Sequence, residues 1–329
     1  MLYSLGFNAF QQLSSDESTA IHSLFPLKGI DRILLASWES TFALTEQNQL
    51  EVLGFQPRSK DLWYDFQAVA MFGDPVGVFG FVDRETNVWL IRDGMCHHLT
   101  TDAKDAVYCA GQNRIYVLQT VQGRVEVFDL NDLTVSSLLN LPPVIMLASS
   151  TTHVLFYTRG SDPIYALGSN RFSQLGMDFH TVSHLDDPQP VDFFCGLGSD
   201  HENGMVACGP FHSAVILDNT LYTFGWRKYG RLGWHTEDDA VVGLPSFLDN
   251  HSSPVDVDVV KVACGSNHTI VLDDQGTIWT CGSDKYGQLG RPVSHVDKYE
   301  DAFRACEFQD QATNCDAGRW SSFIYTASA

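Results

Sequence analysis

Residues 259–290 read VVKVACGSNHTIVLDDQGTIWTCGSDKYGQLG and show the clearest local pattern in the chain. An apolar run ends in Ala-Cys-Gly, and a short loop leads to a second apolar run that begins His-Thr. A D-x-x-G turn then leads to an aromatic run and to a glycine-rich loop that closes on Gln-Leu-Gly. Short runs of apolar residues between Gly, Asn and Asp turns indicate β-strands rather than helices. The stretch therefore predicts one small antiparallel sheet.

The same unit recurs along the chain. Residues 205–233 form a second sharp copy, and the closing glycines Gly176, Gly233 and Gly290 are 57 residues apart both times. The two chain ends carry complementary halves of the unit, because the front half ends the chain and the back half, MLYSLGFNAFQQLS, begins it. The predicted units are 33–57, 76–94, 106–130, 145–176, 205–233, 259–290, and finally 306–327 joined with 1–14.

Six whole units and two halves predict an all-β, seven-bladed propeller with four-stranded blades. One such sheet cannot bury both of its faces alone, so the sheets must stack. Radial closure leaves no bare sheet edge between the first and last blades. We expect a single domain over residues 1–329, closed by a blade that the N- and C-termini share. We also expect the propeller to be complete and without extensions.

The repeat resembles that of the regulator of chromosome condensation (RCC) family. Its pattern is A-C-G-x-x-H-[ST], then G-x-[IL]-[WY], then G-[QR]-L-G. The two sharp copies match it with Ala207, Cys208, Gly209, His212, Gly230 and Gly233, and with Ala263, Cys264, Gly265, His268, Trp279, Gly287 and Gly290. The resemblance covers essentially the whole chain and implies an RCC-type propeller.

The residues locked to the repeat are interpreted as structural. Cys208 and Cys264 are expected to be small buried side chains rather than metal ligands. Gly209 and Gly265 should end the inner strand, where neighbouring blades leave no room for a Cβ atom. His212 and His268 are expected to form buried hydrogen bonds, because a catalytic residue is normally unique in a chain. Gly230 and Gly287 should adopt positive φ in the outer turn.

The formal net charge is −20. Between residues 172 and 260 there are thirteen Asp and Glu against three basic residues, Arg227, Lys228 and Arg231. Such a surface repels phosphate backbones, so direct nucleic-acid binding is not expected. The acidic residues either attract a basic partner or only keep the protein soluble. No apolar run reaches the length of a membrane span and no signal peptide is recognisable, so we expect a cytoplasmic or nuclear protein.

No catalytic motif stands out in the sequence. G-x-S-x-G, P-loop and dinucleotide fingerprints are missing, as is any C-x-x-C pair. His180 and His184, followed by Asp186 and Asp187, have a metal-like spacing, but we interpret them as solvated residues of a loop between blades. We expect no enzyme, no cofactor and no metal.

Binding is the expected role, and topology suggests the surface. In a four-stranded meander, the loops after the first and third strands lie on one face. Exposed Trp, Arg and Phe on such loops are typical anchors for a protein partner. The predicted partner-binding residues are Trp38, Glu39, Phe211, Trp226, Arg227, Lys228, Asn267, Arg319 and Trp320, and the same loops carry Asn8, Arg171, Phe172, Asp284 and Lys285. Alternatively, the tryptophans fold back and plug the central channel.

The resemblance implies an adaptor. Short propellers of this kind resemble the fungal killer-toxin-insensitivity factor linked to Elongator. That likeness implies a heterodimer with a small zinc-ribbon protein in tRNA wobble-uridine modification and diphthamide synthesis. The opening residues also resemble the short RCC-domain adaptor of a JmjC histone demethylase. The alternative is guanine-nucleotide exchange on a Ran-type GTPase, which would require an inserted wedge. The third unit runs compactly through IYVLQTVQGRVEVF without a wedge, and we expect no basic arm before the first unit, so both features count against exchange activity.

Overall fold

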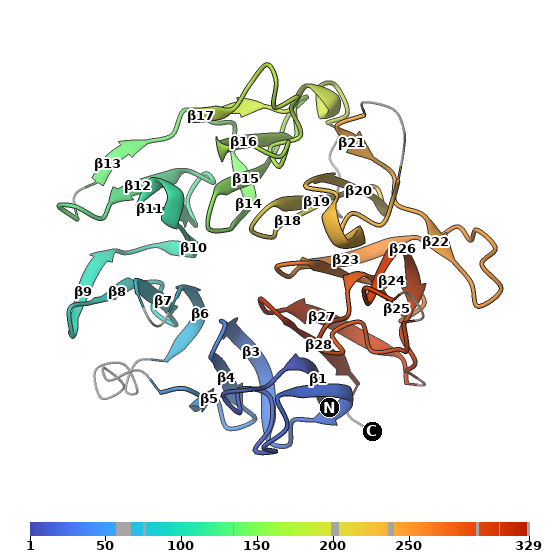
Figure 1. Ribbon diagram of the computed structural model, residues 1–329. Coiled ribbons are helices and arrows are strands. Elements are labelled where there is room, and N and C mark those ends of the chain that lie inside the picture. The colour runs from blue at the N-terminus through green and yellow to red at the C-terminus, as the bar shows by residue number, and fades with distance from the viewer. Residues whose placement is uncertain are drawn as a thin grey trace.

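Figure 1 shows seven β-sheets arranged as blades around a central axis, seen along that axis. The computed structural model describes residues 1–56, 67–74, 77–133, 135–198, 204–235, 240–293, 296–308 and 310–327. Within these ranges the chain forms strands and three short 3-10 turns, namely η2 (Ala110–Gln112), η3 (Asp192–Phe194) and η4 (Lys228–Gly230). The described residues contain no helix that is long and apolar enough to cross a membrane. The predicted all-β propeller is confirmed.

Blades are numbered here by the position of their first strand in the chain. Blade 1 contains β3 (Ile30–Ala36), β4 (Ser40–Thr45) and β5 (Leu50–Gly54) among the described residues. Blade 2 contains β6 (Ala68–Gly73), β7 (Phe79–Asp83), β8 (Val88–Arg92) and β9 (Met95–Thr100). Blade 3 contains β10 (Ala103–Cys109), β11 (Arg114–Gln119), β12 (Val125–Asp129) and β13 (Val135–Leu138). Blade 4 contains β14 (Val144–Ser149), β15 (His153–Thr158), β16 (Ile164–Ser169) and β17 (His184–Pro190).

The remaining blades include one with an added strand and one built from both chain ends. Blade 5 contains β18 (Met205–Cys208), β19 (His212–Leu217), β20 (Thr220–Gly225) and β21 (Val242–Gly243). Blade 6 contains β23 (Val259–Cys264), β24 (His268–Asp273), β25 (Ile278–Ser283) and β26 (Tyr299–Ala305), and the short β22 (Phe247–Leu248) joins it parallel to β26. Blade 7 contains β27 (Ala312–Ala317), β28 (Ser321–Thr326), β1 (Leu2–Phe7) and β2 (Ala20–Pro26).

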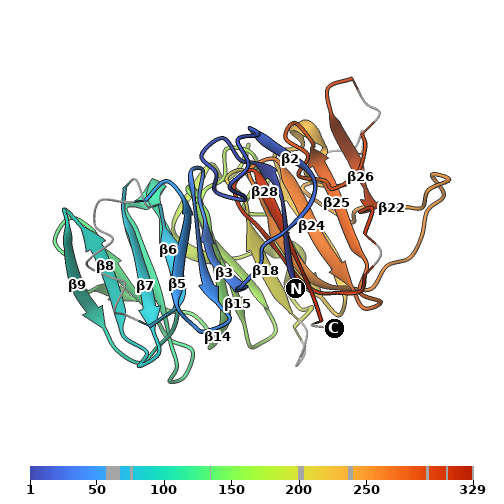
Figure 2. The ribbon, with the colours of Figure 1, turned by 90° about the horizontal axis from the view of Figure 1, so that it is seen from below.

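The two chain ends close the ring inside blade 7. β1 pairs antiparallel with β28, with Leu2 opposite Tyr325 and Gly6 opposite Ser321. The Met1 amino group donates to the Thr326 carbonyl at 2.9 Å, and Figure 2 shows the two termini side by side. The N-terminal part supplies two strands, β1 and β2, and β2 lies beyond residue 14, where the predicted unit ends.

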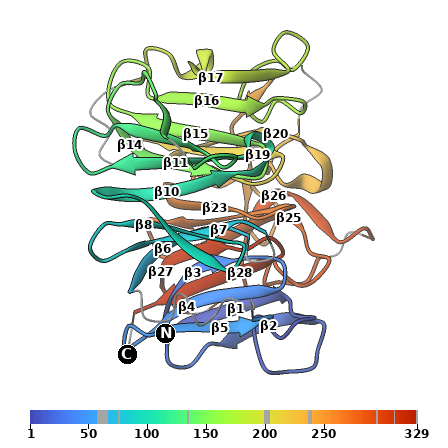
Figure 3. The ribbon, with the colours of Figure 1, turned by 90° about the vertical axis from the view of Figure 1, so that its left-hand side faces the viewer.

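The outer strands of the blades were not predicted from the sequence, and their exposure to solvent explains why. Figure 3 shows β17 at the outer edge of its blade, and its residues alternate between exposed and half-buried. An edge strand with one solvated side needs few apolar residues, so HLDDPQP gives no strand signal.

The hydrophobic core lies between adjacent blades. Phe156 and Leu167 of blade 4 pack against Tyr116 and Val127 of blade 3, and all four are buried. Similar clusters follow around the ring, including one in which Leu5 and Ile324 of blade 7 meet Ile270 of blade 6. Full burial of one such side chain contributes about 1.5–3 kcal/mol, so the contacts between blades hold the ring together.

Candidate functional site

Loops after the first and third strands gather at one end of the blades, and this surface is called the loop face below. Trp38, Glu39, Phe211, Asn267, Arg319 and Trp320 lie after first strands, and Trp226, Arg227 and Lys228 lie after a third strand. Hydrogen bonds join the two kinds of loop across neighbouring blades. The Gln12 amide donates to the Trp38 carbonyl at 2.9 Å, and the Arg231 guanidinium donates to the Ser266 carbonyl at 3.0 Å.

Trp38 and Trp320 belong to an aromatic cluster where blades 6, 7 and 1 meet. Their ring centroids are 6.0 Å apart, and Phe7 lies 5.1 Å from Trp38. Tyr286 completes the cluster at 4.8 Å from Phe7 and 5.5 Å from Trp320. Trp38 is 38% exposed and the adjoining Phe10 is 44% exposed. These rings therefore offer apolar surface to solvent from a mutually packed base.

A second aromatic cluster joins blades 4 and 5. Phe172 stacks on Trp226 at 4.9 Å with an interplanar angle of 22°, and Phe211 lies 5.6 Å from Trp226. The Lys228 ammonium lies 5.4 Å from the Trp226 ring and 4.9 Å from the Tyr229 ring. Tyr229 is 39% exposed. Cation–π contacts of this kind place positive charge on an aromatic surface.

Arg231 lies beneath this second cluster and is fully buried. Its guanidinium carbon lies 4.9 Å from the Trp226 ring, and its Nε donates to the Lys228 carbonyl at 2.9 Å. Burial lowers the pKa of Arg231 to about 10. The sequence grouped Arg231 with the surface charges, although its place in the G-[QR]-L-G pattern is filled by Gln12 and Gln288 in other blades. Because the same position is filled by a polar residue in other blades, the repeat itself indicated a structural role for Arg231.

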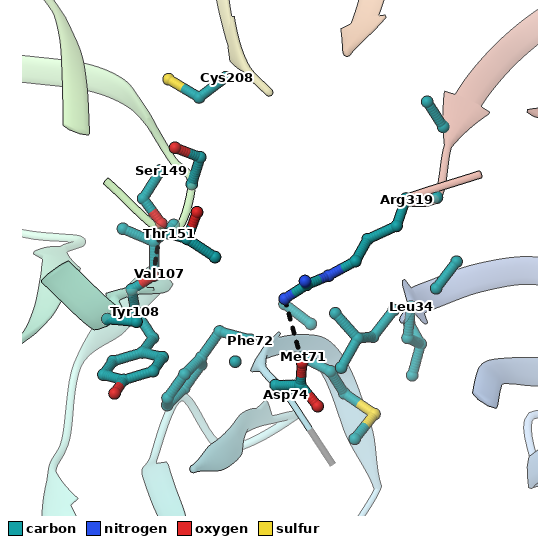
Figure 4. A pocket seen from close by; sticks show the side chains of 18 of the residues that line it. Leu34, Met71, Phe72, Asp74, Val107, Tyr108, Ser149, Thr151, Cys208 and Arg319 are labelled. Carbon is teal, nitrogen blue, oxygen red and sulfur yellow. Dashed lines mark hydrogen bonds and ion pairs between the residues drawn. The ribbon is translucent and has the colours of Figure 1, made fainter. Parts of the chain in front are cut away.

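Arg319 reaches across the central channel, as Figure 4 shows. Its guanidinium forms an ion pair with Asp74 of blade 2 at 3.0 Å, and both side chains are about one-third exposed. Glu39 lies beside this pair, and its pKa is raised by burial and by Asp74, although Arg319 lowers it. Asp74 was missed because it lies outside the predicted units, just before the unit 76–94.

The channel contains a cavity of about 840 Å³. Leu34, Met71 and Phe72 form an apolar wall, and Cys208 and Cys264 line the cavity as well. None of the described residues that line it is a tryptophan, so the tryptophans of the loop face do not plug the channel. Burial raises the pKa of the Asp105 carboxyl in this cavity to about 6. Both cysteines are half-buried rather than buried as predicted, because they face the channel, but desolvation still raises the pKa of each thiol, that of Cys264 to about 12, and keeps both protonated.

The repeated histidines join one blade to the next. His153, His212 and His268 approach Ser213, Thr269 and Ser322 of the following blade at 2.7, 3.0 and 3.1 Å through Nε2. Each hydroxyl donates its single proton to a backbone carbonyl, as Thr269 does to Arg231 at 2.7 Å. The ring Nε2–H must therefore donate to the hydroxyl oxygen. Burial lowers the pKa of His153 to about 3 and that of His268 to about 4, so both rings stay neutral.

The histidine rings also account for the glycines beside them. A Cβ atom on Gly265 would lie 2.1 Å from Cε1 of His268, and one on Gly209 would lie 2.4 Å from Cε1 of His212. A Cβ on Gly209 would also approach the Gly265 carbonyl of the next blade at 2.5 Å. The predicted crowding between blades is therefore present at Gly209, although the His212 ring of the same blade is slightly closer than the next blade. Gly230 and Gly287 adopt the predicted positive φ, at 69° and 85°.

Three sequence-based placements need correction. Asn8 and Asp284 were assigned to the exposed loop surface, but both are buried. Asn8 Oδ1 accepts the backbone N–H of Leu13 at 2.8 Å and Asp284 Oδ1 that of Leu289 at 3.0 Å, so they hold the loop backbone. His184 and its two following aspartates lie on the outer strand β17, not in a loop between blades.

His184 Nε2 lies 3.2 Å from Asp186 in an exposed pair. Among the residues whose structure is described, no group of three His, Cys, Asp or Glu side chains could hold a metal ion.

Comparison with known proteins supports the propeller of repeated blades described above. The sequence model described as the regulator of chromosome condensation (RCC1) repeat matches residues 218–272, and a second model of the same repeat matches residues 259–288. The chain carries RCC1 repeats. Together the two matches span residues 218–288, within blades 5 and 6.

Relatives of the chain share its repeat or its fold. The X-linked retinitis pigmentosa GTPase regulator homolog of Caenorhabditis elegans is 34% identical over 44% of this chain, and the match spans only 10% of that relative's length. The crystal structure of human WBSCR16 superimposes with a TM-score of 0.74 at 14% identity, covering 99% of this chain and 100% of that one. Prp20p from Saccharomyces cerevisiae gives 0.72 at 14% identity, covering 99% and 92%. At such identities the superpositions show the fold alone.

Proposed function

We propose that this protein is a non-catalytic adaptor that binds a protein partner with its loop face. The observation that carries the proposal is the pair of aromatic clusters on that face, each with a partly exposed ring. Trp38 in one cluster and Tyr229 in the other are both more than one-third exposed. Exposed tryptophan and tyrosine held in a packed setting are the residue types that dominate binding energy at protein interfaces.

Charge adds a requirement on the partner. The exposed Arg227 and Lys228 lie between residues 172 and 260, where thirteen residues are acidic and the only other basic residue is the buried Arg231. A complementary partner would place a carboxylate against these two cations and basic residues around them. The acidic surroundings speed the approach of a basic partner at low salt.

The relatives support a protein partner as a class. Prp20p from Saccharomyces cerevisiae binds Gsp1p and histones. A zinc-ribbon partner in tRNA wobble-uridine modification and diphthamide synthesis, and a JmjC demethylase partner, rest on sequence resemblance alone. A cytoplasmic or nuclear location is part of the same proposal.

Guanine-nucleotide exchange on a Ran-type GTPase is the second candidate, favoured by the fold shared with Prp20p over 99% of this chain. Blade 3 weighs against it, because the turn between β11 and β12 is closed by a bond from Gln119 N to Arg124 O at 2.8 Å and holds no wedge. Stimulated release of labelled GDP from a Ran-type GTPase by the purified protein would establish exchange and displace the adaptor proposal.

The adaptor proposal is tested by affinity purification at low salt with quantitative mass spectrometry. The wild type should retain a stoichiometric partner that the double variant Trp38→Ala, Lys228→Glu loses. The matched control is Arg84→Glu with Val121→Ala, which changes one exposed cation and one exposed apolar side chain on the opposite side of the ring. A wild type that purifies alone would overturn the proposal.

A further inference from the structure

We propose that the protein has a second binding site, on the opposite side of the ring from the loop face, for a phosphorylated small molecule of about nucleotide size. The site is a cleft between blades 3 and 4, which Figure 1 shows as neighbours. Lys104, Arg124 and Arg159 line it, and we call it the basic cleft.

Hydrogen bonds of residues 143–145, at the start of blade 4, hold the chain near the three cations, two of them across to blade 3 and one within blade 4. Val144 N donates to the Gly123 carbonyl at 2.9 Å, and Arg159 N donates to the Pro143 carbonyl at 2.9 Å. A Cβ on Gly123 would lie 2.4 Å from the Val144 carbonyl oxygen, so the chain before Arg124 lies directly against blade 4. Lys104 Nζ donates to the Ile145 carbonyl at 2.8 Å. The Pro143–Ile145 segment of blade 4 therefore contacts the chain at or next to each of the three cations.

Among the described residues, Arg124 and Arg159 lack the carboxylate partners that Arg304 and Arg319 have, whereas Lys104 interacts electrostatically with its sequence neighbour Asp105. No residue that lines the cleft is an Asp or a Glu. Arg304 and Arg319 form ion pairs with carboxylates, whereas the side chains of Arg124 and Arg159 form none within the described part of the chain. The Glu126 carboxylate on β12, two residues after Arg124, accepts hydrogen bonds from the Thr100 hydroxyl at 3.0 Å and from the Gln119 amide at 2.9 Å. A concentrated positive site in a chain of net charge −20 is suited to an anion.

The size and lining of the cleft restrict the class of anion that it can bind. The cleft has a volume of about 640 Å³, within the range of about 300–1,000 Å³ that is typical of small-molecule sites. Leu139, Leu141 and Pro143 give it an apolar side on which an organic body can pack. Guanidinium groups bind phosphate through paired hydrogen bonds, and three cations balance the charge of a diphosphate. Single carboxylates of an acidic peptide would use this charge less completely.

The test is isothermal titration of the whole protein at low salt with EDTA present. ADP and pyrophosphate should each bind saturably at one site, whereas adenosine should not bind. Arg124→Glu and Arg159→Glu should each raise the dissociation constant of ADP at least about tenfold, because each removes a charge-assisted hydrogen bond. Arg159→Lys should give an intermediate value, since it keeps the charge and loses the planar fork.

Controls make each outcome decisive. Lys228→Glu, on the loop face, should bind ADP as the wild type does, and unchanged thermal midpoints confirm that the cleft variants fold. ADP should slow backbone hydrogen exchange at residues 119–125 and 139–145. Absence of saturable ADP binding, wild-type affinity for ADP in both Glu variants, or tighter binding of a glutamate-rich peptide than of ADP would overturn the proposal. None of these results bears on the loop face, so the adaptor function is tested separately.

Discussion

Single polar side chains connect the blades at the residue level. The histidine and hydroxyl pairs run from blade 4 to blade 7, where the repeats are sharpest. The sequence predicted buried hydrogen-bonding histidines from their periodicity alone. It could not predict their acceptors, because Thr269 and Ser322 lie one blade further on and only packing brings them to the rings.

Arg231 provides a direct test of the periodic interpretation. Gln12 fills the equivalent position and bonds a loop carbonyl of the next blade in the same way. Arg231→Gln should therefore lower the free energy of unfolding by about 1 kcal/mol or less. Arg231→Ala should lower it by about 2–4 kcal/mol, because it leaves buried carbonyls unpaired and opens a cavity. Urea denaturation of both variants measures the difference, and equal losses would contradict the structural role.

The buried histidines predict how stability depends on pH. In the unfolded chain His268 takes a proton near pH 6.5, but in the folded protein it does so only near pH 4. The unfolded state therefore binds more protons between these values, and stability falls as the pH falls through this window. Asp105, whose folded pKa is raised to about 6, acts in the opposite direction.

The variant His268→Gln separates the contribution of His268 to the pH dependence from that of Asp105. His268→Gln cannot be protonated, so its free energy of unfolding should fall less steeply than that of the wild type between pH 6.5 and 4. The difference in slope should approach about 1.4 kcal/mol per pH unit. Identical slopes would show that His268 does not titrate differently on unfolding.

At the level of elements, the closing blade is the feature on which the ring depends. The complementary half-repeats at the two ends predicted that both ends share a blade, and the β1–β28 pairing confirms it. The outer strands, such as β2 and β17, could not be predicted, since an edge strand requires no apolar alternation.

Removal of residues 1–13 tests this blade. The deletion removes β1, with the buried Leu2 and Leu5, and separates β2 from β28. We expect loss of the cooperative thermal transition or a large fall in its midpoint, although loss of a typical N-terminus has little effect. A synthetic peptide of residues 1–13 added in trans should restore the transition. An unchanged midpoint in the deletion variant would contradict this role.

For the whole molecule, seven blades present two unlike surfaces. The loop face carries the aromatic clusters, and all nine predicted partner-binding residues lie on its loops. The sequence could place those loops because strand order fixes which turns share a face. It could not reveal that Asn8 is buried or that Arg319 pairs with Asp74 across the channel, because both depend on how distant loops fold over the ring.

Binding through the loop face is tested by the dissociation constant of the co-purified partner, measured for the wild type and two double variants. Trp38→Ala with Lys228→Glu, on the loop face, should weaken binding at least about thirtyfold, as loss of an interface anchor does. Arg84→Glu with Val121→Ala, on the opposite side, should leave the constant unchanged. Wild-type affinity in the loop-face variant, or a loss confined to the opposite-side variant, would contradict the account.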